Sequence, residues 1–135
     1  MTKIIIGVKG TGKTKTLIEM INSALESSKG SVVCIEKGDN LKLALSYNCR
    51  LINSDEYMVN DAQALYGFIA GLMASNHDIT DLFIDATYRI CQRDAEAFDK
   101  FVTEVDELSS KYGMNVVMTV SMPAEDTTDT MKKYL

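Results

Sequence analysis

Hydrophobic residues along the chain form two alternating patterns, short unbroken runs and stripes with helical spacing. The runs lie at residues 4–6, 31–36, 80–85 and 115–121. Unbroken runs of this kind are typical of strands covered on both faces. The stripes repeat every three or four residues, as in Leu17, Ile21 and Leu25, and predict helices between the runs.

The clearest helix is expected over Asp94–Tyr112, which begins with acidic residues and closes at Gly113. The first helix is expected to follow residue 14 and to end at Gly30 with a left-handed cap. Further helices are predicted at residues 62–73 and 124–135. Two weaker patterns suggest a short helix at residues 41–46 and an edge strand at residues 50–52.

Strands that alternate with helices predict right-handed crossovers and a parallel sheet. We therefore expect an α/β fold, a three-layer α/β/α sandwich with a mostly parallel sheet. Ligands of such sheets bind at the carboxyl ends of the strands. Glu36, Asp85 and Ser121 each end a predicted strand and should lie on that edge.

Composition narrows the class of protein. The chain has 135 residues, 46% of them hydrophobic, which suits one domain over residues 1–135. The net charge of −5 opposes a phosphate backbone, so no direct binding to nucleic acid is expected. The longest apolar stretch, residues 65–74, is too short to cross a bilayer, and the first residues lack the long apolar core and cleavage site expected of a signal peptide. We expect no membrane partner and a cytoplasmic location.

Thiol and imidazole chemistry is not expected to carry the function. Cys34, Cys49 and Cys91 are odd in number and widely spaced, which disfavours a disulfide framework or a zinc site. The only histidine, His77, lies at the polar end of a helical pattern and is expected at the surface.

The strongest local signal is the segment Gly7–Thr14, which fits G-x-x-x-x-G-K-[ST] and stands between a strand pattern and a helix pattern. Glycines are expected at positions 7, 10 and 12 because the backbone there must adopt positive φ and bring its N–H groups close to phosphate oxygens. Lys13 would reach the β- and γ-phosphates, and the Thr14 hydroxyl would bind Mg²⁺. The alternative is a glycine-rich turn with no ligand.

This segment resembles the Walker A loop of P-loop NTPases, a family that binds a nucleoside triphosphate with Mg²⁺ on a three-layer α/β sandwich. The resemblance implies ATP and Mg²⁺ as ligands. The residues that it implies for nucleotide binding are Gly7, Lys9, Gly10, Thr11, Gly12, Lys13, Thr14 and Lys15.

Asp85 follows three apolar residues and resembles a Walker B aspartate, whose carboxylate would hold Mg²⁺ through water opposite Thr14. The alternative is a strand-end acid that caps the next turn. Many hydrolysing members of the family have a glutamate next. Ala86 stands there in this chain, so hydrolysis would need a base from elsewhere.

The segment that ends in Glu36 resembles the second strand of RecA-like ATPases, whose last residue is the catalytic glutamate. We expect Lys13, Glu36 and Ser121 to form the catalytic set, with Glu36 as base and Ser121 as a polar sensor of γ-phosphate. The alternatives are a solvent-exposed strand-end glutamate and a serine hydroxyl bonded within its own turn.

Arg89 and Arg93 could supply an arginine finger, which in RecA-like enzymes comes from a neighbouring subunit. Under that resemblance they would act only in an oligomer. The alternative is a surface or ion-pair role.

The leading functional hypothesis is an ATP-binding P-loop protein with weak or assembly-dependent ATP hydrolysis. Its partners would be a nucleoside triphosphate and either a second copy of the chain or a larger protein. The alternatives are a non-catalytic ATP-binding regulatory module and a small-molecule or nucleoside kinase. A small GTPase is disfavoured because no N-K-x-D sequence occurs.

Overall fold

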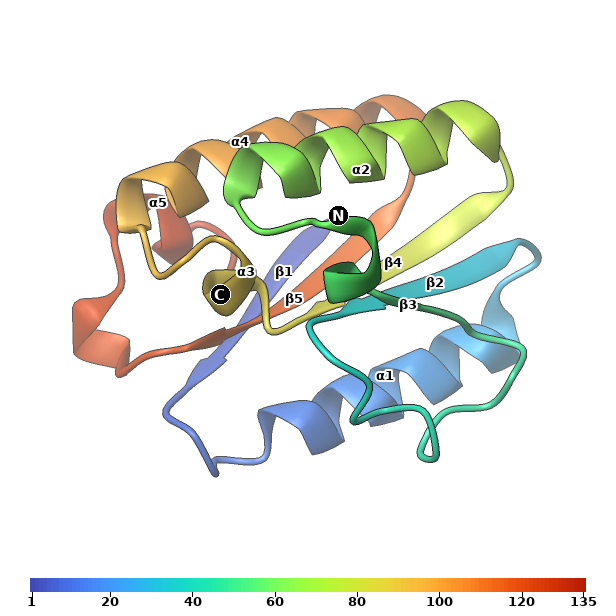
Figure 1. The fold of residues 1–135 in the computed structure, drawn as a ribbon, viewed down its shortest axis with the longest axis horizontal. Helices are drawn as coiled ribbons and strands as arrows, with labels where there is room; N and C mark the ends of the chain where they lie inside the picture. Colours follow the sequence, from blue (N-terminus) through green and yellow to red (C-terminus); the bar gives the residue numbers. More distant parts are fainter.

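A five-stranded sheet, parallel throughout, forms the centre of the protein (Figure 1). The structure, a computed structural model, describes all residues from 1 to 135. The strand order is β1-β5-β4-β2-β3. The strands are β1 (Thr2–Gly7), β2 (Ser31–Glu36), β3 (Arg50–Asn53), β4 (Ile79–Asp85) and β5 (Asn115–Ser121).

Helices cover both faces of the sheet, an arrangement consistent with a three-layer α/β/α sandwich. Helices α2 and α4 lie on one face and α1 on the other (Figure 1). The expected α/β fold with a parallel sheet is confirmed. The helices are α1 (Lys13–Ser27), α2 (Ala62–Ser75), α3 (Thr87–Ile90), α4 (Ala95–Tyr112) and α5 (Asp129–Lys132), with 3-10 turns at Ser54–Tyr57 and Ala124–Asp126.

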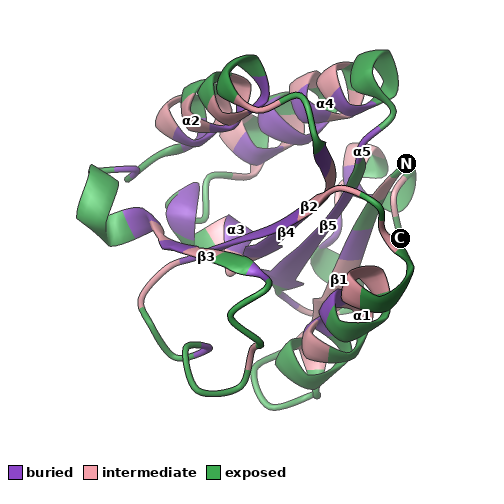
Figure 2. Cartoon of the chain, turned by 90° about the vertical axis from the view of Figure 1, so that its right-hand side faces the viewer, coloured by how far each residue is buried: buried purple, intermediate pink, exposed green.

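Two hydrophobic clusters, one on each face, explain why the strands appear in the sequence as unbroken runs. Successive side chains of a strand point to opposite faces. Phe83 accordingly belongs to the smaller cluster with Leu17 and Ile21 of α1, whereas its neighbour Ile84 belongs to the larger cluster with Phe98 of α4. Both kinds of position are buried, as the purple strands in Figure 2 show.

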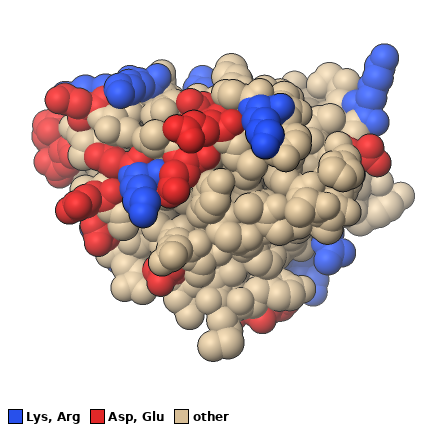
Figure 3. All heavy atoms as spheres, turned by 90° about the horizontal axis from the view of Figure 1, so that it is seen from above, with Lys and Arg blue, Asp and Glu red and all other residues tan.

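The side of the molecule formed by α2 and α4 carries a gathering of acidic side chains (Figure 3). Helix α4 alone contains five carboxylates along its length. None of the helices combines the length and the apolar character needed to span a membrane.

The predicted helix at residues 41–46 is wrong. Those residues form turns, because the backbone N–H groups of Asn40 and Leu41 donate to the Glu36 carboxylate. Only the backbone N–H groups of Ala44 and Leu45 donate to the Leu41 carbonyl. The edge strand predicted at residues 50–52 is confirmed as β3.

The predicted ends of two helices also differ from the structure. The expected helix over residues 124–135 is broken at Thr127 and Thr128, whose backbones are extended, and Thr128 caps the short helix α5. Helix α1 ends at Ser27, and Gly30 has no left-handed backbone. Glycine is needed at position 30 for space, since a Cβ there would collide with the Asp78 carbonyl.

Candidate functional site

The carboxyl edge of the sheet brings the predicted site residues together. Strand register places Gly7 opposite Ser121 and Glu36 opposite Asp85. A cavity of about 880 Å³ opens at this edge, within the size range of small-molecule sites. Its chemically active lining residues are Lys9, Lys13, Thr14, Glu36, Lys37, Asp85, Arg89, Arg93 and Ser121.

The glycine loop between β1 and α1 forms one wall of the cavity. Gly10 and Gly12 have positive φ values of 87° and 85°, as expected from the sequence. Gly7 does not, and the expectation of a positive φ there is wrong. Glycine is required at position 7 because a Cβ would collide with Thr11 Oγ1.

The loop is braced from within by two side chains that donate to one carbonyl. Thr11 Oγ1 donates to the Val8 oxygen at 2.7 Å, and Lys13 Nζ donates to the same oxygen at 3.0 Å. Three residues expected to bind nucleotide, Gly7, Thr11 and Lys15, do not line the cavity, whereas Lys13 and Thr14 do. Thr11 therefore braces the loop and does not line the cavity.

The N-terminus of α1 presents backbone N–H groups that no side chain satisfies. Gly12 is the N-cap and provides no side-chain hydrogen bond, and the first turn contains no acidic residue. The first N–H groups of a helix have no partner within the helix and carry partial positive charge. This end of α1 is suited to an anion.

Asp85 is half-buried and is held by the neighbouring strand. Its Oδ1 accepts from Thr119 Oγ1 at 2.5 Å, while Oδ2 forms no hydrogen bond. The residue does not cap the following turn, since the N-cap of α3 is Ala86, without a side-chain hydrogen bond. One carboxylate oxygen thus remains available to a cation, on the same cavity as the Thr14 hydroxyl.

Thr119 is a site residue that the sequence interpretation missed. It is buried in β5 within the apolar segment Val116–Val120. A polar residue within a buried strand needs a hydrogen-bond partner, and this requirement was the available signal.

Glu36 is buried, so the alternative of a solvent-exposed glutamate is wrong. Its two oxygens accept from the backbone N–H groups of Asn40, at 3.0 Å, and Leu41, at 3.1 Å. Burial raises the pKa of Glu36 above its ordinary value, and the Asp85 charge adds to this, while the two N–H groups lower the pKa. Glu36 combines a raised pKa with a structural task, anchoring the turns after β2.

Ser121 is exposed at the end of β5 and lines the cavity. Its hydroxyl forms no hydrogen bond within its own turn, so that alternative is also wrong. The backbone N–H of the next residue, Met122, donates to the Gly7 carbonyl at 3.2 Å, and this bond connects the end of β5 to the end of β1.

Arg89 and Arg93 line the cavity from the same chain as the loop. A neighbouring subunit is therefore not needed to bring them to this cavity, whereas their action as an arginine finger in an oligomer stays a prediction. Neither forms an ion pair within 4.0 Å, which also removes the ion-pair alternative. The sequence analysis predicted no element at residues 86–93, whereas the short helix α3 lies directly after Asp85 at the sheet edge.

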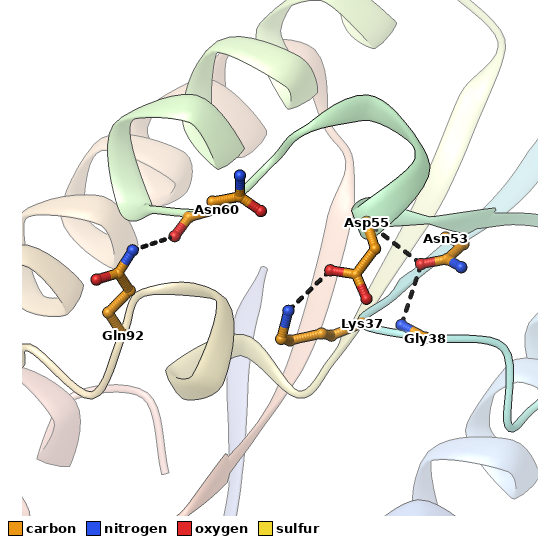
Figure 4. Close-up of polar contacts among 6 residues, drawn as sticks. All are labelled: Lys37, Gly38, Asn53, Asp55, Asn60 and Gln92. Carbon is orange, nitrogen blue, oxygen red and sulfur yellow. Dashed lines mark hydrogen bonds and ion pairs between the residues drawn. The ribbon is translucent and has the colours of Figure 1, made fainter.

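Lys37 is a further lining residue that the sequence did not reveal. Its Nζ forms an ion pair with Asp55 at 2.8 Å, and Asn53 Oδ1 accepts from the backbone N–H groups of Asp55 and Gly38 (Figure 4). These contacts fix the end of β2 against the end of β3.

The cavity is net positive although the chain is acidic. Five Lys and Arg side chains and two carboxylates line it, while the whole chain carries −5. A cleft lined mainly by one sign of charge concentrates ligands of the opposite sign. No group of three or more His, Cys, Asp or Glu is arranged to hold a metal ion, so a cation here would need oxygens from water or from an anionic ligand.

No protein-family model matches the chain, and no curated protein matches it as a relative.

Proposed function

We propose that this chain is a P-loop nucleotide-binding domain that binds ATP with Mg²⁺ in the cavity at the carboxyl edge of the sheet. The observation that carries the proposal is the glycine loop, with its uncapped helix N-terminus, in a net-positive cavity. A loop that exposes backbone N–H groups at a helix N-terminus is a phosphate-binding device.

Different lining groups would bind different parts of the ligand. The loop amides and Lys13 would hold the phosphates, for which Lys13 would exchange its hydrogen bond to the Val8 carbonyl. Thr14 and the free Oδ2 of Asp85 are hard oxygen ligands of the kind that Mg²⁺ prefers, and Thr119 orients the Asp85 carboxylate. When bound, Mg²⁺ neutralises charge that develops on phosphate oxygens.

Weak or assembly-dependent ATP hydrolysis is the activity that we assign. Glu36 would accept a proton from a water molecule, a role that its raised pKa suits. The water oxygen would bond to the γ-phosphorus as the bond to ADP breaks. Ser121, with a free hydroxyl on the cavity, would orient that water or the γ-phosphate.

A non-catalytic ATP-binding module is the second candidate. Both Glu36 oxygens already accept backbone N–H groups, and Ala86 offers no carboxylate beside Asp85. A small-molecule or nucleoside kinase is the third candidate, supported by two arginines on the cavity that could face an anionic acceptor.

Titration calorimetry with Mg·ATP tests the proposal on wild type, Lys13→Ala and Lys15→Ala. We expect Lys13→Ala to weaken binding tenfold to a hundredfold, or about 1.5–3 kcal/mol for a lost charge-assisted contact. Lys15→Ala is the matched control, since this lysine is two positions away, is exposed and does not line the cavity. Equal affinities in all three proteins, or no binding by wild type, would show that the cavity does not bind ATP through Lys13 and the loop.

A further inference from the structure

The turn between β4 and α4 brings two unpaired guanidinium groups to the nucleotide cavity. Arg89 lies within the short helix α3 that follows Asp85, and Arg93 directly precedes Asp94, the N-cap of α4. Both are exposed, both line the cavity, and neither forms an ion pair or a side-chain hydrogen bond. Each has its full set of donors free for a ligand.

This turn is anchored to the rest of the protein. Gln92 and Arg93 have left-handed backbones, with φ values of 57° and 54°. The Arg93 N–H donates to the Tyr88 carbonyl at 2.8 Å, and Gln92 Nε2 donates to the Asn60 carbonyl at 2.7 Å, which ties the turn to the segment before α2 (Figure 4). Both arginines therefore lie on a turn whose backbone is held in place by hydrogen bonds.

The other cations on the cavity are differently placed. Lys13 donates to the Val8 carbonyl, and Lys37 is paired with Asp55. Lys9 belongs to the glycine loop itself. Arg89 and Arg93 are therefore the unpaired cations that reach the cavity from outside the loop.

Sheet geometry sets the separation between the strand ends from which the loop and the arginine turn begin. Strand β5 lies between β1, which leads into the loop, and β4, which leads into the arginine turn. Two strand spacings amount to about 10 Å. A ligand whose phosphates begin on the loop would extend its terminal phosphate across this interval toward the arginines.

We propose that Arg89 and Arg93 bind the terminal phosphate of the nucleotide within one chain, so that a monomer distinguishes a nucleoside triphosphate from a diphosphate. This inference rests on the proposed function. A planar guanidinium matches phosphate oxygens in a bidentate manner, and a diphosphate lacks the group that the arginines would contact.

The test compares dissociation constants for Mg·ATP and Mg·ADP in wild type, Arg89→Gln, Arg93→Asn and Arg50→Gln. Asparagine is chosen at position 93 because it tolerates a left-handed backbone better than most residues do. Arg50 is the matched control, since it is the third arginine, is exposed and lies on edge strand β3 away from this cavity. Each titration is repeated at two protein concentrations, with the molecular mass measured at both.

We expect each cavity variant to weaken ATP binding tenfold to a hundredfold, the effect of a lost charge-assisted contact. ADP binding should change less than threefold, and Arg50→Gln should behave as wild type. The ATP preference of wild type should be the same at both concentrations while the protein is monomeric.

Three results would overturn the inference. Equal loss of ATP and ADP affinity would show a general charge effect. Unchanged ATP affinity would show that the arginines do not bind the terminal phosphate and would favour another anion as their ligand, such as the anionic acceptor of a kinase. An ATP preference that appears only when the chain associates would place the arginines in a neighbouring copy. Failure of wild type to bind either nucleotide would instead reject the proposed function itself.

Discussion

The carboxylates of Glu36 and Asp85 are register partners at one edge of the sheet, yet they are held in different ways. Glu36 is buried, and both its oxygens accept backbone N–H groups. Asp85 is half-buried, and only one of its oxygens is engaged, by Thr119. The free oxygen suits Asp85 to a cation, whereas the raised pKa suits Glu36 to proton transfer.

Asp85→Asn should weaken the Mg²⁺-dependent part of ATP binding about tenfold or more, and should leave binding without metal nearly unchanged. The amide oxygen can still accept from Thr119, but the charge that faces the metal is lost. Paired titrations with Mg²⁺ and with a chelator measure both parts. An equal loss in the two titrations would make Asp85 structural. Thr119→Val is the companion variant and should show a smaller loss of the same kind.

Glu36→Gln should reduce ATP turnover by about 10²–10⁴ while ATP affinity stays within about threefold. Glutamine cannot take the proton from water. Because its NH₂ group cannot accept, either Asn40 or Leu41 also loses its partner, which should cost about 1–3 kcal/mol of unfolding free energy. Steady-state turnover and urea unfolding separate the two effects. Unchanged turnover would assign the base to another group, and no turnover in wild type would favour the binding module.

At the scale of single elements, the strands and the cavity edge could be predicted, whereas the connections could not. Buried strands are marked by apolar runs, and parallel alternation places their carboxyl ends together. The turns at residues 41–46 depend on Glu36, a contact between a strand and a loop that no local pattern contains. The position of Arg93 likewise depends on a left-handed turn held by Asn60, which lies far away in sequence.

The break in the C-terminal segment has a similar cause. Thr127 Oγ1 donates to the Ala124 carbonyl, and Thr128 Oγ1 accepts from Met131 N and donates to Asp99 of α4. These threonine contacts compete with a continuous helix. Helical spacing alone does not show which option the tertiary contacts favour.

Gly12→Ala and Gly71→Ala should change stability in opposite directions. Both glycines have open space around the Cβ position, so backbone conformation alone decides the outcome. Gly12 has a φ of 85°, where alanine is strained by about 1 kcal/mol or more. Gly71 lies inside α2, where alanine should add about 0.5–1 kcal/mol.

Urea unfolding measures the change in unfolding free energy of each glycine variant, and nucleotide titration compares their ATP affinities. Gly12→Ala should also weaken ATP binding, because the substitution disturbs the loop that presents the amides. Gly71→Ala should leave ATP affinity unchanged. Equal stabilisation by both substitutions would show that the left-handed loop conformation is not required.

The molecule as a whole combines a parallel sheet, a left-handed glycine loop and a net-positive cavity in an acidic chain. The fold explains why residues from four separate segments, which follow β1, β2, β4 and β5, meet at one edge. We propose that these features together let the cavity bind Mg·ATP through the loop. At 135 residues, the chain is small enough for residue-by-residue mapping of that claim in solution.

The most direct test is amide chemical-shift mapping by NMR, with a non-hydrolysable ATP analogue and Mg²⁺ added to the wild-type protein. The largest chemical-shift changes should fall on the amides of loop residues 9–15 and of Asp85 and Ala86. The Lys13→Ala variant should need at least tenfold more ligand to show shift changes of the same size. Changes centred instead on the separate groove of Ile52, Phe68 and neighbouring residues, or no change at millimolar ligand, would contradict the account.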